Sequence, residues 1–330
     1  MAQDAPHQKI VLNVGAIEDM VTDNPWKACC TGEYEMMFLN YDMLLTFAQE
    51  DLSAAPGLAT GCTPSSDSMT WTCSIRSGIR WSDGEPLTSR DVAFTYRFVL
   101  ENGISLYENY LPFNPTFETP NDQTLIWKAE RPTFAPIVPP WIYIVPEHIW
   151  SQYEGMTPKE IKSVSNTPSV GSGPFQLAEW RPGQLWRMEA NPDYWGGAPA
   201  IDEVVFRVFN NQEAMAQAVR SGDIDVAGDL NPSLFLALKD QADIHTAKTL
   251  PDWWLNLAFN FGGQGSDATN DPALQDLSVR QAIAHAIDKQ AIVDLVYRGF
   301  ALPGDTVVRP ASTAWHLDLP PDQEFAFDPD

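Results

Sequence analysis

A strand, a helix and a second strand follow one another closely near the middle of the chain, and this pattern restricts the fold most. Ile201–Phe209 and Ile224–Ala227 are strand candidates, and Asn211–Ser221 between them is a helix candidate. Gly222 follows the helix, where a C-cap needs the left-handed backbone that glycine adopts without steric cost. A β–α–β unit of about two dozen residues predicts an α/β fold.

The chain is too long for one ordinary hydrophobic core, so its 330 residues predict two lobes. Hydrophobic residues make up 44% of it and aromatic residues 11%, which is enough to build a globular interior. Twelve tryptophans are a high count. Some belong to the core, and a surplus of flat rings suits a cleft for peptides or sugars.

The charge balance excludes several classes of partner. There are 44 acidic against 20 basic residues, for a formal net charge of −24. Nucleic acids and anionic lipids need Lys/Arg-rich surfaces, so neither is an expected partner. No apolar stretch is long enough to predict a membrane span. Met1–Pro6 has no signal-peptide pattern, and we expect an initiator Met before a mature sequence from which an export signal was removed.

The four cysteines fall into two pairs. Cys62 and Cys73 bracket a turn-rich segment and predict a disulfide between adjacent strands. Cys29 and Cys30 are neighbours, and a bridge between neighbours is strained. Either one of these thiols pairs elsewhere or both are free. No spacing fits a CxxC metal pattern, so no metal or cofactor is expected.

Periodicity and helix-end signals predict the other elements. Thr88 stands three residues before Asp91, which is a variant capping box and marks a helix start. Asp288 is an N-cap candidate for a later helix. Expected strands are Ile10–Gly15, Met69–Ile75, Thr124–Lys128, Gln176–Trp180, Leu185–Ala190 and Trp254–Phe259; expected helices are Pro146–Trp150, Ser278–Ala286 and Lys289–Arg298, and Tyr34–Phe47 is expected to be a helix that runs into a strand.

Three groups of short motifs occur in a fixed order along most of the chain. They are Ile75–Thr88 with Asp91–Thr95; then Gly171–Phe175, Asn191–Gly196, Ile201–Asp202 and Ser221–Asp225; and last Leu257–Asn260, Val279–Ala282 and Ala286–Lys289. In this order they resemble the family 5 extracellular solute-binding proteins, the peptide-, nickel- and oligosaccharide-binding receptors of ABC importers.

The physical role of these motifs is structural. Asp83–Gly84 favours a tight turn, and Gly173 permits a close approach of two backbones. Asn191–Asp193 predicts a turn that places Tyr194 and Trp195 against the fold. We therefore expect the motifs to identify the family without contacting a ligand.

The resemblance implies a periplasmic-binding-protein-like fold of two α/β lobes with an extra subdomain inserted in the first. Residues 1–47 and 168–252 would form lobe one, and 48–167 the inserted subdomain. Residues 253–330 would hold the hinge and the first part of lobe two. Chains of this family continue after a motif like Phe327–Asp330, so the second lobe and the hinge return are expected to be incomplete here, with weakened ligand binding.

The resemblance also implies a function. The chain would be a non-enzymatic, monomeric receptor at the extracellular face of the membrane or in the periplasm, with a lipid anchor possible in the native protein. It would capture a short peptide and deliver it to membrane permease subunits. The alternatives are an oligosaccharide or metal-chelate receptor and a sensing module without transport. A catalytic Cys–His pair has no recognisable nucleophile context.

Ligands of open α/β sheets lie beyond the carboxyl ends of strands. This rule points to the loops 23–34, 171–174, 227–230 and 251–256. The acids would meet a peptide ammonium group by charge-assisted hydrogen bonds, and the rings would form platforms. Core packing is the alternative for each tryptophan and a solvated acid for each aspartate. The candidate ligand-binding residues are Trp26, Tyr34, Asp229, Asp252, Trp253, Trp254 and Asn256.

Overall fold

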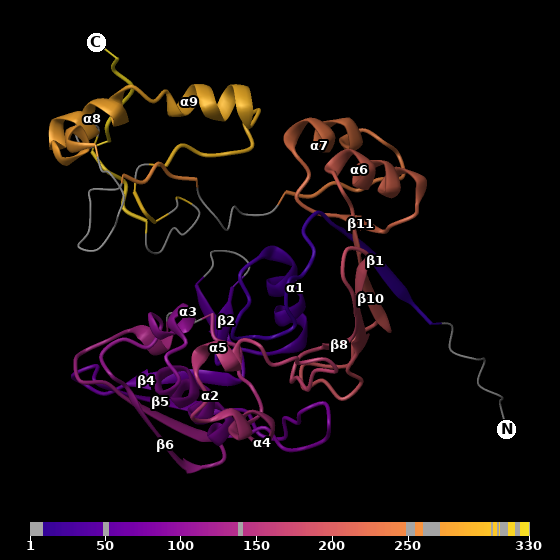
Figure 1. Cartoon of the computed structure of the whole chain (residues 1–330), viewed down its shortest axis with the longest axis vertical. Helices are drawn as coiled ribbons and strands as arrows, with labels where there is room; N and C mark the ends of the chain where they lie inside the picture. The colour runs from indigo at the N-terminus through magenta and orange to yellow at the C-terminus, as the bar shows by residue number, and fades with distance from the viewer. Residues whose placement is uncertain are drawn as a thin grey trace. The chain divides into compact units, whose positions relative to one another are not determined.

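The computed structural model describes residues 9–48, 53–137, 141–248, 255–259, 271–304, 306–308, 310, 316–320 and 324–329. The described residues up to Leu230 form one compact unit, and those from Asn231 onward form a second. Figure 1 labels the helices and strands of the chain. In the part of the chain so described, no helix combines the length and apolar character that crossing a bilayer needs.

The first unit contains a five-stranded mixed sheet in the order β11-β1-β10-β9-β8. β1 lies between β10 and β11 and runs parallel to both, whereas β9 is antiparallel to β10 and β8. The strands are β1 (Val11–Ala16), β8 (Phe175–Arg181), β9 (Leu185–Ala190), β10 (Glu203–Val208) and β11 (Val226–Ala227).

The predicted β–α–β unit is confirmed as β10, α6 (Gln212–Ser221) and β11. The side chain of Asn211 caps α6 by accepting a hydrogen bond from the Ala214 N–H at 2.8 Å. Gly222 ends the helix with a φ of 78°, the left-handed conformation expected there.

A four-stranded antiparallel sheet in the order β4-β5-β7-β6 forms the core of the segment between β3 and β8. Its strands are β4 (Ala59–Pro64), β5 (Thr70–Ile75), β6 (Thr116–Asn121) and β7 (Thr124–Lys128). Helix α2 (Ser89–Glu101) packs on β6 and β7. The predicted capping box is confirmed, because Thr88 accepts from the Arg90 N–H while Asp91 accepts from the Thr88 N–H at 2.8 Å.

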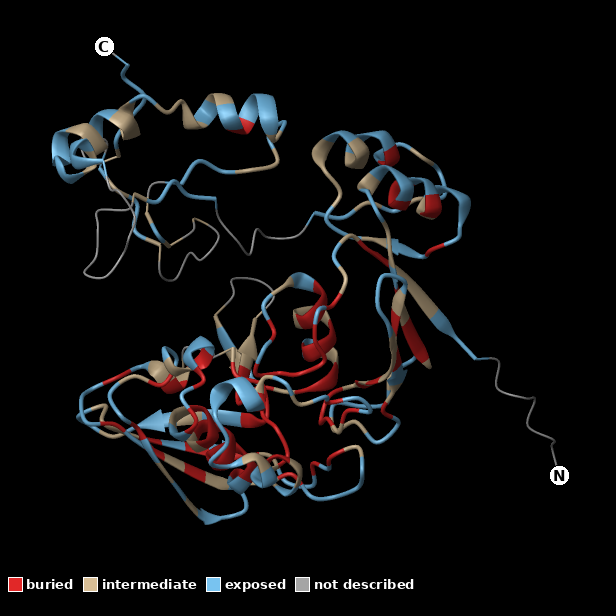
Figure 2. Ribbon diagram, viewed as in Figure 1, coloured by how far each residue is buried: buried red, intermediate tan, exposed pale blue. Residues whose placement is uncertain are grey.

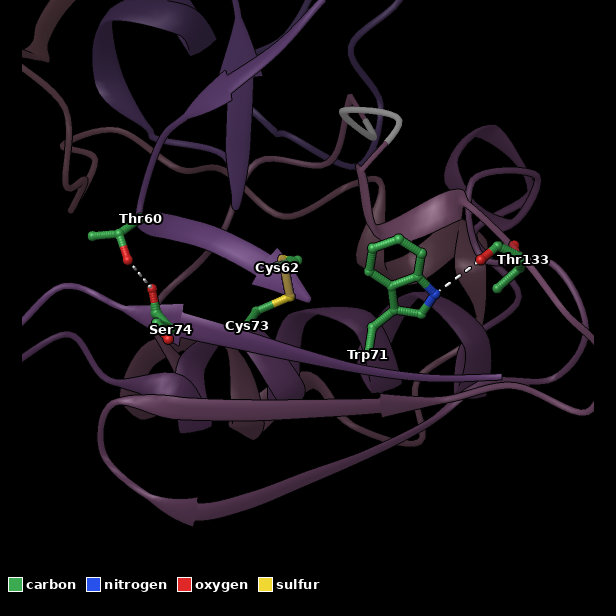
Figure 3. Close-up of a disulfide and its surroundings, with 6 residues drawn as sticks. All are labelled: Thr60, Cys62, Trp71, Cys73, Ser74 and Thr133. Carbon is green, nitrogen blue, oxygen red and sulfur yellow. Dashed lines mark hydrogen bonds between the residues drawn. A yellow bond between two sulfur atoms is a disulfide. The ribbon is translucent and has the colours of Figure 1, made fainter. Parts of the chain in front are cut away.

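The predicted disulfide between Cys62 and Cys73 is confirmed. These residues stand directly opposite each other on β4 and β5, and Figure 3 shows the bridge between the two strands. Nearby on β5, the Trp71 indole donates to the Thr133 carbonyl at 2.9 Å. The bridge therefore ties an edge strand of this sheet to its inner neighbour.

Helix α1 (Thr31–Asn40) packs on β8 and is followed by β2 (Leu45–Phe47), which pairs with β3 (Ala54–Pro56). The prediction of a helix that runs into a strand is thus confirmed, with the helix starting earlier. The remaining short helices of this unit are α3 (Ser105–Glu108), η1 (Ala135–Ile137), α4 (Glu147–Trp150), η2 (Ser151–Tyr153) and α5 (Pro158–Ile161). One large core cluster joins the two main sheets and α1 and α2, and Figure 2 shows the buried residues gathered in this unit.

Two sequence motifs fix how α1 meets the sheet. A Cβ atom added to Gly173 would lie 2.3 Å from the Leu39 carbonyl oxygen, so the predicted close backbone approach is confirmed. The turn at Asn191 holds Tyr194 and Trp195, whose polar atoms donate to Asp42 at 3.3 and 3.1 Å. Both motifs thus act on the end of α1 and the segment after it.

The regular elements described in the second unit are all helices. Its elements are α7 (Pro232–Lys239), η3 (Pro272–Gln275), α8 (Leu277–His285), α9 (Lys289–Ala291) and the π-helix η4 (Ile292–Val296). Asp288 caps α9 as predicted, since its side chain accepts from the Ala291 N–H at 2.8 Å.

One prediction for this unit was confirmed in most of its length and another was wrong. The expected helix over Lys289–Arg298 is α-helical at Lys289–Ala291 and π-helical at Ile292–Val296, and Arg298 has a φ of 50°. Apolar spacing does not separate i→i+4 from i→i+5 bonding. Residues 255–259 of the expected strand Trp254–Phe259 carry no regular structure, and Trp254 lies outside the described residues. Alternating apolar residues predict a strand only where a partner strand pairs with them.

Candidate functional site

Two parallel strands end next to each other at one end of the five-stranded sheet. β1 ends at Ala16 and β11 at Ala227, with Gly15 opposite Ala227 in the register. Ligands of open α/β sheets bind beyond the carboxyl ends of such strands. The residues that follow, 17–30 after β1 and 228–230 after β11, are therefore the first to consider for a site.

Two carboxylates from this region act on a third, Glu35, and we call Glu18, Glu35 and Asp229 the acidic triplet. Glu18 follows β1, Asp229 follows β11, and Glu35 lies on α1. Burial raises the pKa of Glu35 from 4.5 to about 7, with further increases from the negative charges of Asp229 and Glu18. A cation beside Glu35 would offset the effects of burial and of the two negative charges, and would favour the ionised form of Glu35.

Glu35 and Asp42 both have a raised pKa, but they differ in the hydrogen bonds that their carboxylates receive. Burial raises the pKa of Asp42 to about 6, although Trp195, Ser172 and Tyr194 all stabilise its ionised form. No hydrogen bond reaches the Glu35 carboxylate from the described residues. The Asp42 carboxylate therefore accepts hydrogen bonds that stabilise the fold, whereas the Glu35 carboxylate can still accept hydrogen bonds from a ligand.

Asp229 is held in a costly backbone conformation. Its φ is 50°, in the left-handed region that a non-glycine residue seldom occupies. Its carbonyl accepts a hydrogen bond at 3.0 Å from the side-chain amide of Gln212, the first residue of α6. Strain of this kind occurs at functional sites more often than elsewhere. The Asp229 side chain is exposed.

The loop between β1 and α1 is fixed by Glu33. Its carboxylate accepts hydrogen bonds from the backbone N–H groups of Val21, Thr22 and Cys30. Glu33, Cys29 and Cys30 also form the group of metal-ligand side chains found among the described residues. Because both Glu33 oxygens already serve the backbone, this group offers a metal two thiols and little else.

Partly exposed aromatic rings from α1 and two other segments gather around Trp141. The Trp141 ring is 5.8 Å from Tyr34, 5.3 Å from Phe38 and 5.5 Å from Phe47, measured between ring centroids. Phe38 remains 38% exposed. We call these four residues the aromatic cluster; two of them, Tyr34 and Phe38, lie on α1, the helix that also carries Glu35.

The structure corrects the expectation for Trp26. Its ring is 1% exposed and packs against Phe98, Tyr107 and Trp150, with centroids 5.4, 5.9 and 5.7 Å away. Because other rings surround it, Trp26 offers no face to a ligand in this structure. Trp26 therefore belongs to the hydrophobic core, which was the alternative to a ligand contact.

The other candidate residues are distributed between the two units. Tyr34 lies half-buried in the aromatic cluster, and Asp229 lies in the acidic triplet together with Glu35, which neighbours Tyr34 on α1. Asn256 is exposed in the second unit. The predicted residues Asp252, Trp253 and Trp254 lie outside the described residues.

Sequence reasoning missed Glu18, Glu35, Phe38 and Trp141. Nothing in their spacing joins them, because they come from a loop, a helix and a distant segment. Phe38 follows Tyr34 by four positions, which places both on one face of a helix. That spacing is the one signal that could have extended the predicted site.

Comparison with known proteins agrees with this architecture. The family described as bacterial extracellular solute-binding proteins, family 5 Middle, matches residues 53–330. The nickel-binding periplasmic protein of Escherichia coli is 28% identical over 298 residues, which are 86% of this chain and 53% of that protein. Protein XP55 of Streptomyces lividans is 32% identical over 77% of this chain and 44% of its own length.

Solved structures share the fold. The oligopeptide-binding protein AppA of Bacillus subtilis, solved with a nonapeptide, has a TM-score of 0.76 at 22% identity; the match covers 98% of this chain and 63% of that one. The present chain spans about half the length of the curated relatives it matches. Its fold is that of the two-lobe periplasmic binding proteins.

Proposed function

The chain belongs to family 5 of the bacterial extracellular solute-binding proteins, and we propose that it captures short peptides for an ABC importer. In this role it binds a ligand in a cleft between lobes and passes it to the permease subunits in the membrane. It works outside the cytoplasm, as a monomer, and carries out no reaction on its ligand.

The acidic triplet carries the proposal for a peptide. A peptide's free amino terminus is a cation that donates several hydrogen bonds, and Glu35 is a half-buried carboxyl to which the described residues supply no donor. The aromatic cluster, two of whose rings lie on the same helix as Glu35, would receive an apolar peptide side chain. The peptide bound to AppA, a protein with the same fold, supports this choice of ligand class.

The rest of the predicted site remains part of the proposal. Asp252, Trp253, Trp254 and Asn256 would approach the ligand from the hinge. We keep 1–47 and 168–252 as lobe one, 48–167 as its inserted subdomain and 253–330 as the hinge with the beginning of lobe two.

Calorimetry with synthetic peptides of graded length tests this function. A peptide with a free amino terminus should bind, and its N-acetylated form should bind at least about tenfold more weakly, because a charge-assisted hydrogen bond contributes roughly 1.5–3 kcal/mol. Glu35→Gln should reduce the preference for the free amine. Glu213→Gln, at an exposed position on α6, is the matched control.

Two other classes of ligand would argue against the peptide assignment if they bind instead. Nickel chelates are included because a relative is a nickel-binding protein, and oligosaccharides because of the tryptophan content. Native mass spectrometry of the protein purified without denaturation identifies any ligand carried along. Binding of a chelate or a sugar, with no binding of peptides, would replace the peptide assignment.

A further inference from the structure

Cys29 and Cys30 are not explained by the proposed function. The sequence contains four cysteines, and Cys62 and Cys73 are already bonded to each other. Within the chain, each member of the adjacent pair therefore has only the other as a possible disulfide partner.

The geometry brings the two thiols together. Their Sγ atoms are 2.7 Å apart, and both cysteines are unbonded. Cys29 is exposed, whereas Cys30 is partly buried at the N-cap of α1. An approaching reagent therefore meets Cys29 first and finds Cys30 directly behind it.

The surroundings leave redox chemistry as the best use of the pair. A metal site is disfavoured, because the third potential ligand, Glu33, already accepts hydrogen bonds from the N–H groups of Thr22 and Cys30 at 3.2 and 3.0 Å. The hydrogen bond with Cys29, burial and the charges of Glu33 and Glu18 raise the pKa of the Cys30 thiol to about 11. Cys30 is thus a poor nucleophile toward molecules in solution and acts best on a neighbour in contact.

We propose that Cys29 and Cys30 are a site of reversible oxidation, at which a small-molecule disulfide converts the adjacent dithiol into a ring disulfide. The Cys29 thiolate attacks one sulfur of the reagent, forms a mixed disulfide and releases one thiolate, which takes up a proton. Cys30 then loses its proton and attacks Cys29 Sγ, displacing the second thiolate. Two electrons and two protons leave the pair, and one disulfide becomes two thiols.

This site differs from the Cys62–Cys73 bridge in how easily it is reduced. A ring between neighbouring residues strains the peptide that joins them, and Cys29 is exposed. Strained and exposed disulfides have higher reduction potentials than structural ones. The ring should therefore open under conditions in which the bridge between β4 and β5 stays closed.

The position of the pair gives oxidation a route to affect α1. Cys30 is the residue before the helix, and its N–H group is bonded to Glu33 within the first turn. Tyr34 and Glu35 follow directly on the same helix. Closing the ring restricts the backbone at the helix start, next to residues that we assign to the ligand site.

Alkylation of the whole 330-residue chain tests the proposal. The protein is equilibrated with glutathione buffers of rising oxidised-to-reduced ratio, quenched in acid, unfolded, alkylated and mapped by mass spectrometry. The peptide with Cys29 and Cys30 should change from two alkyl groups to none, with the loss of two hydrogens. The Cys62–Cys73 peptide should stay unalkylated throughout and serves as an internal reference.

Single variants separate the two steps. Cys30→Ser should retain one glutathione on Cys29, because the attacking neighbour is missing, and Cys29→Ser should react more slowly. Two alkyl groups at every ratio would overturn the proposal. The proposal would also be overturned if the protein with both cysteines kept a bound glutathione, or if it formed a disulfide-linked dimer in place of the ring.

Discussion

Glu35 and Asp42 show, at the scale of single residues, how one type of side chain takes two different roles. Burial raises the pKa of both carboxyls, to about 7 and about 6. Hydrogen bonds donated by Tyr194 and Trp195 partly offset the unfavourable burial of the Asp42 carboxylate. The Glu35 carboxylate receives no such hydrogen bond from the described residues, so a cationic ligand would stabilise its ionised form.

The pKa of Glu35 predicts how stability depends on pH. Because the folded-state pKa is raised above 4.5 to about 7, the folded protein holds a proton that the unfolded chain releases in this range. The free energy of unfolding should therefore fall as the pH rises from 4.5 to about 7, and this residue should contribute at most about 3 kcal/mol to the fall. Urea unfolding at both ends of the range should show a smaller fall in Glu35→Gln than in the unmodified protein or Glu213→Gln. An unchanged fall would contradict the prediction.

Trp26 gives a prediction about stability. Its ring is 1% exposed among three other rings, so Trp26→Ala should lower the free energy of unfolding by about 3–5 kcal/mol. Trp26→Phe should cost less, because it keeps an aromatic ring. Denaturant unfolding measures both. A normal stability combined with lost ligand binding would return Trp26 to the list of ligand contacts.

Helix α1 is the element on which fold and site meet. One face packs on β8 and buries Met36 and Met37, while Tyr34, Glu35 and Phe38 remain at least partly accessible. Its C-terminal end lies against the Gly171–Gly173 backbone. The position of the site residues therefore depends on how closely that backbone approaches the helix.

Gly173→Ala tests this dependence. The new Cβ would lie 2.3 Å from the Leu39 carbonyl oxygen, and because both atoms belong to or adjoin the backbone, the helix end must shift. We expect a loss of stability of about 1–3 kcal/mol and weaker ligand binding. Gly61→Ala on β4, where a Cβ would meet nothing within 4 Å, should change neither. Equal thermal unfolding of the two variants would argue against a close contact.

Elements with local end signals could be predicted from the sequence, and those that depend on distant partners could not. Thr88 with Asp91 marked α2, and Asn211 with Gly222 marked α6, because the groups that end a helix are close to it in sequence. The strand expected at Trp254–Phe259 had no such signal. The site follows the same rule. Asp229 was predicted from its place after a strand, whereas the raised pKa of Glu35 depends on burial in the fold and on the charges of Asp229 and Glu18, which are distant in sequence.

For the whole molecule, the first unit contains its own core. The large buried cluster extends from Ala16 to Phe206, and all five strands of the mixed sheet precede Leu230. We expect residues 1–230 to fold alone and to unfold cooperatively, with native near-ultraviolet circular dichroism. A fragment that gives far-ultraviolet signal but no near-ultraviolet signal would show that the second unit is needed.

The strand order also dictates when this protein can fold during its synthesis. β1 is made first, yet both of its neighbours, β10 and β11, are made more than half the chain later. The four-stranded sheet with α2 draws on one continuous stretch and can form early. A ribosome that has just finished that stretch therefore presents a structured segment behind a β1 strand that has neither of its partners until residues 203–208 emerge, and has both only after residue 227.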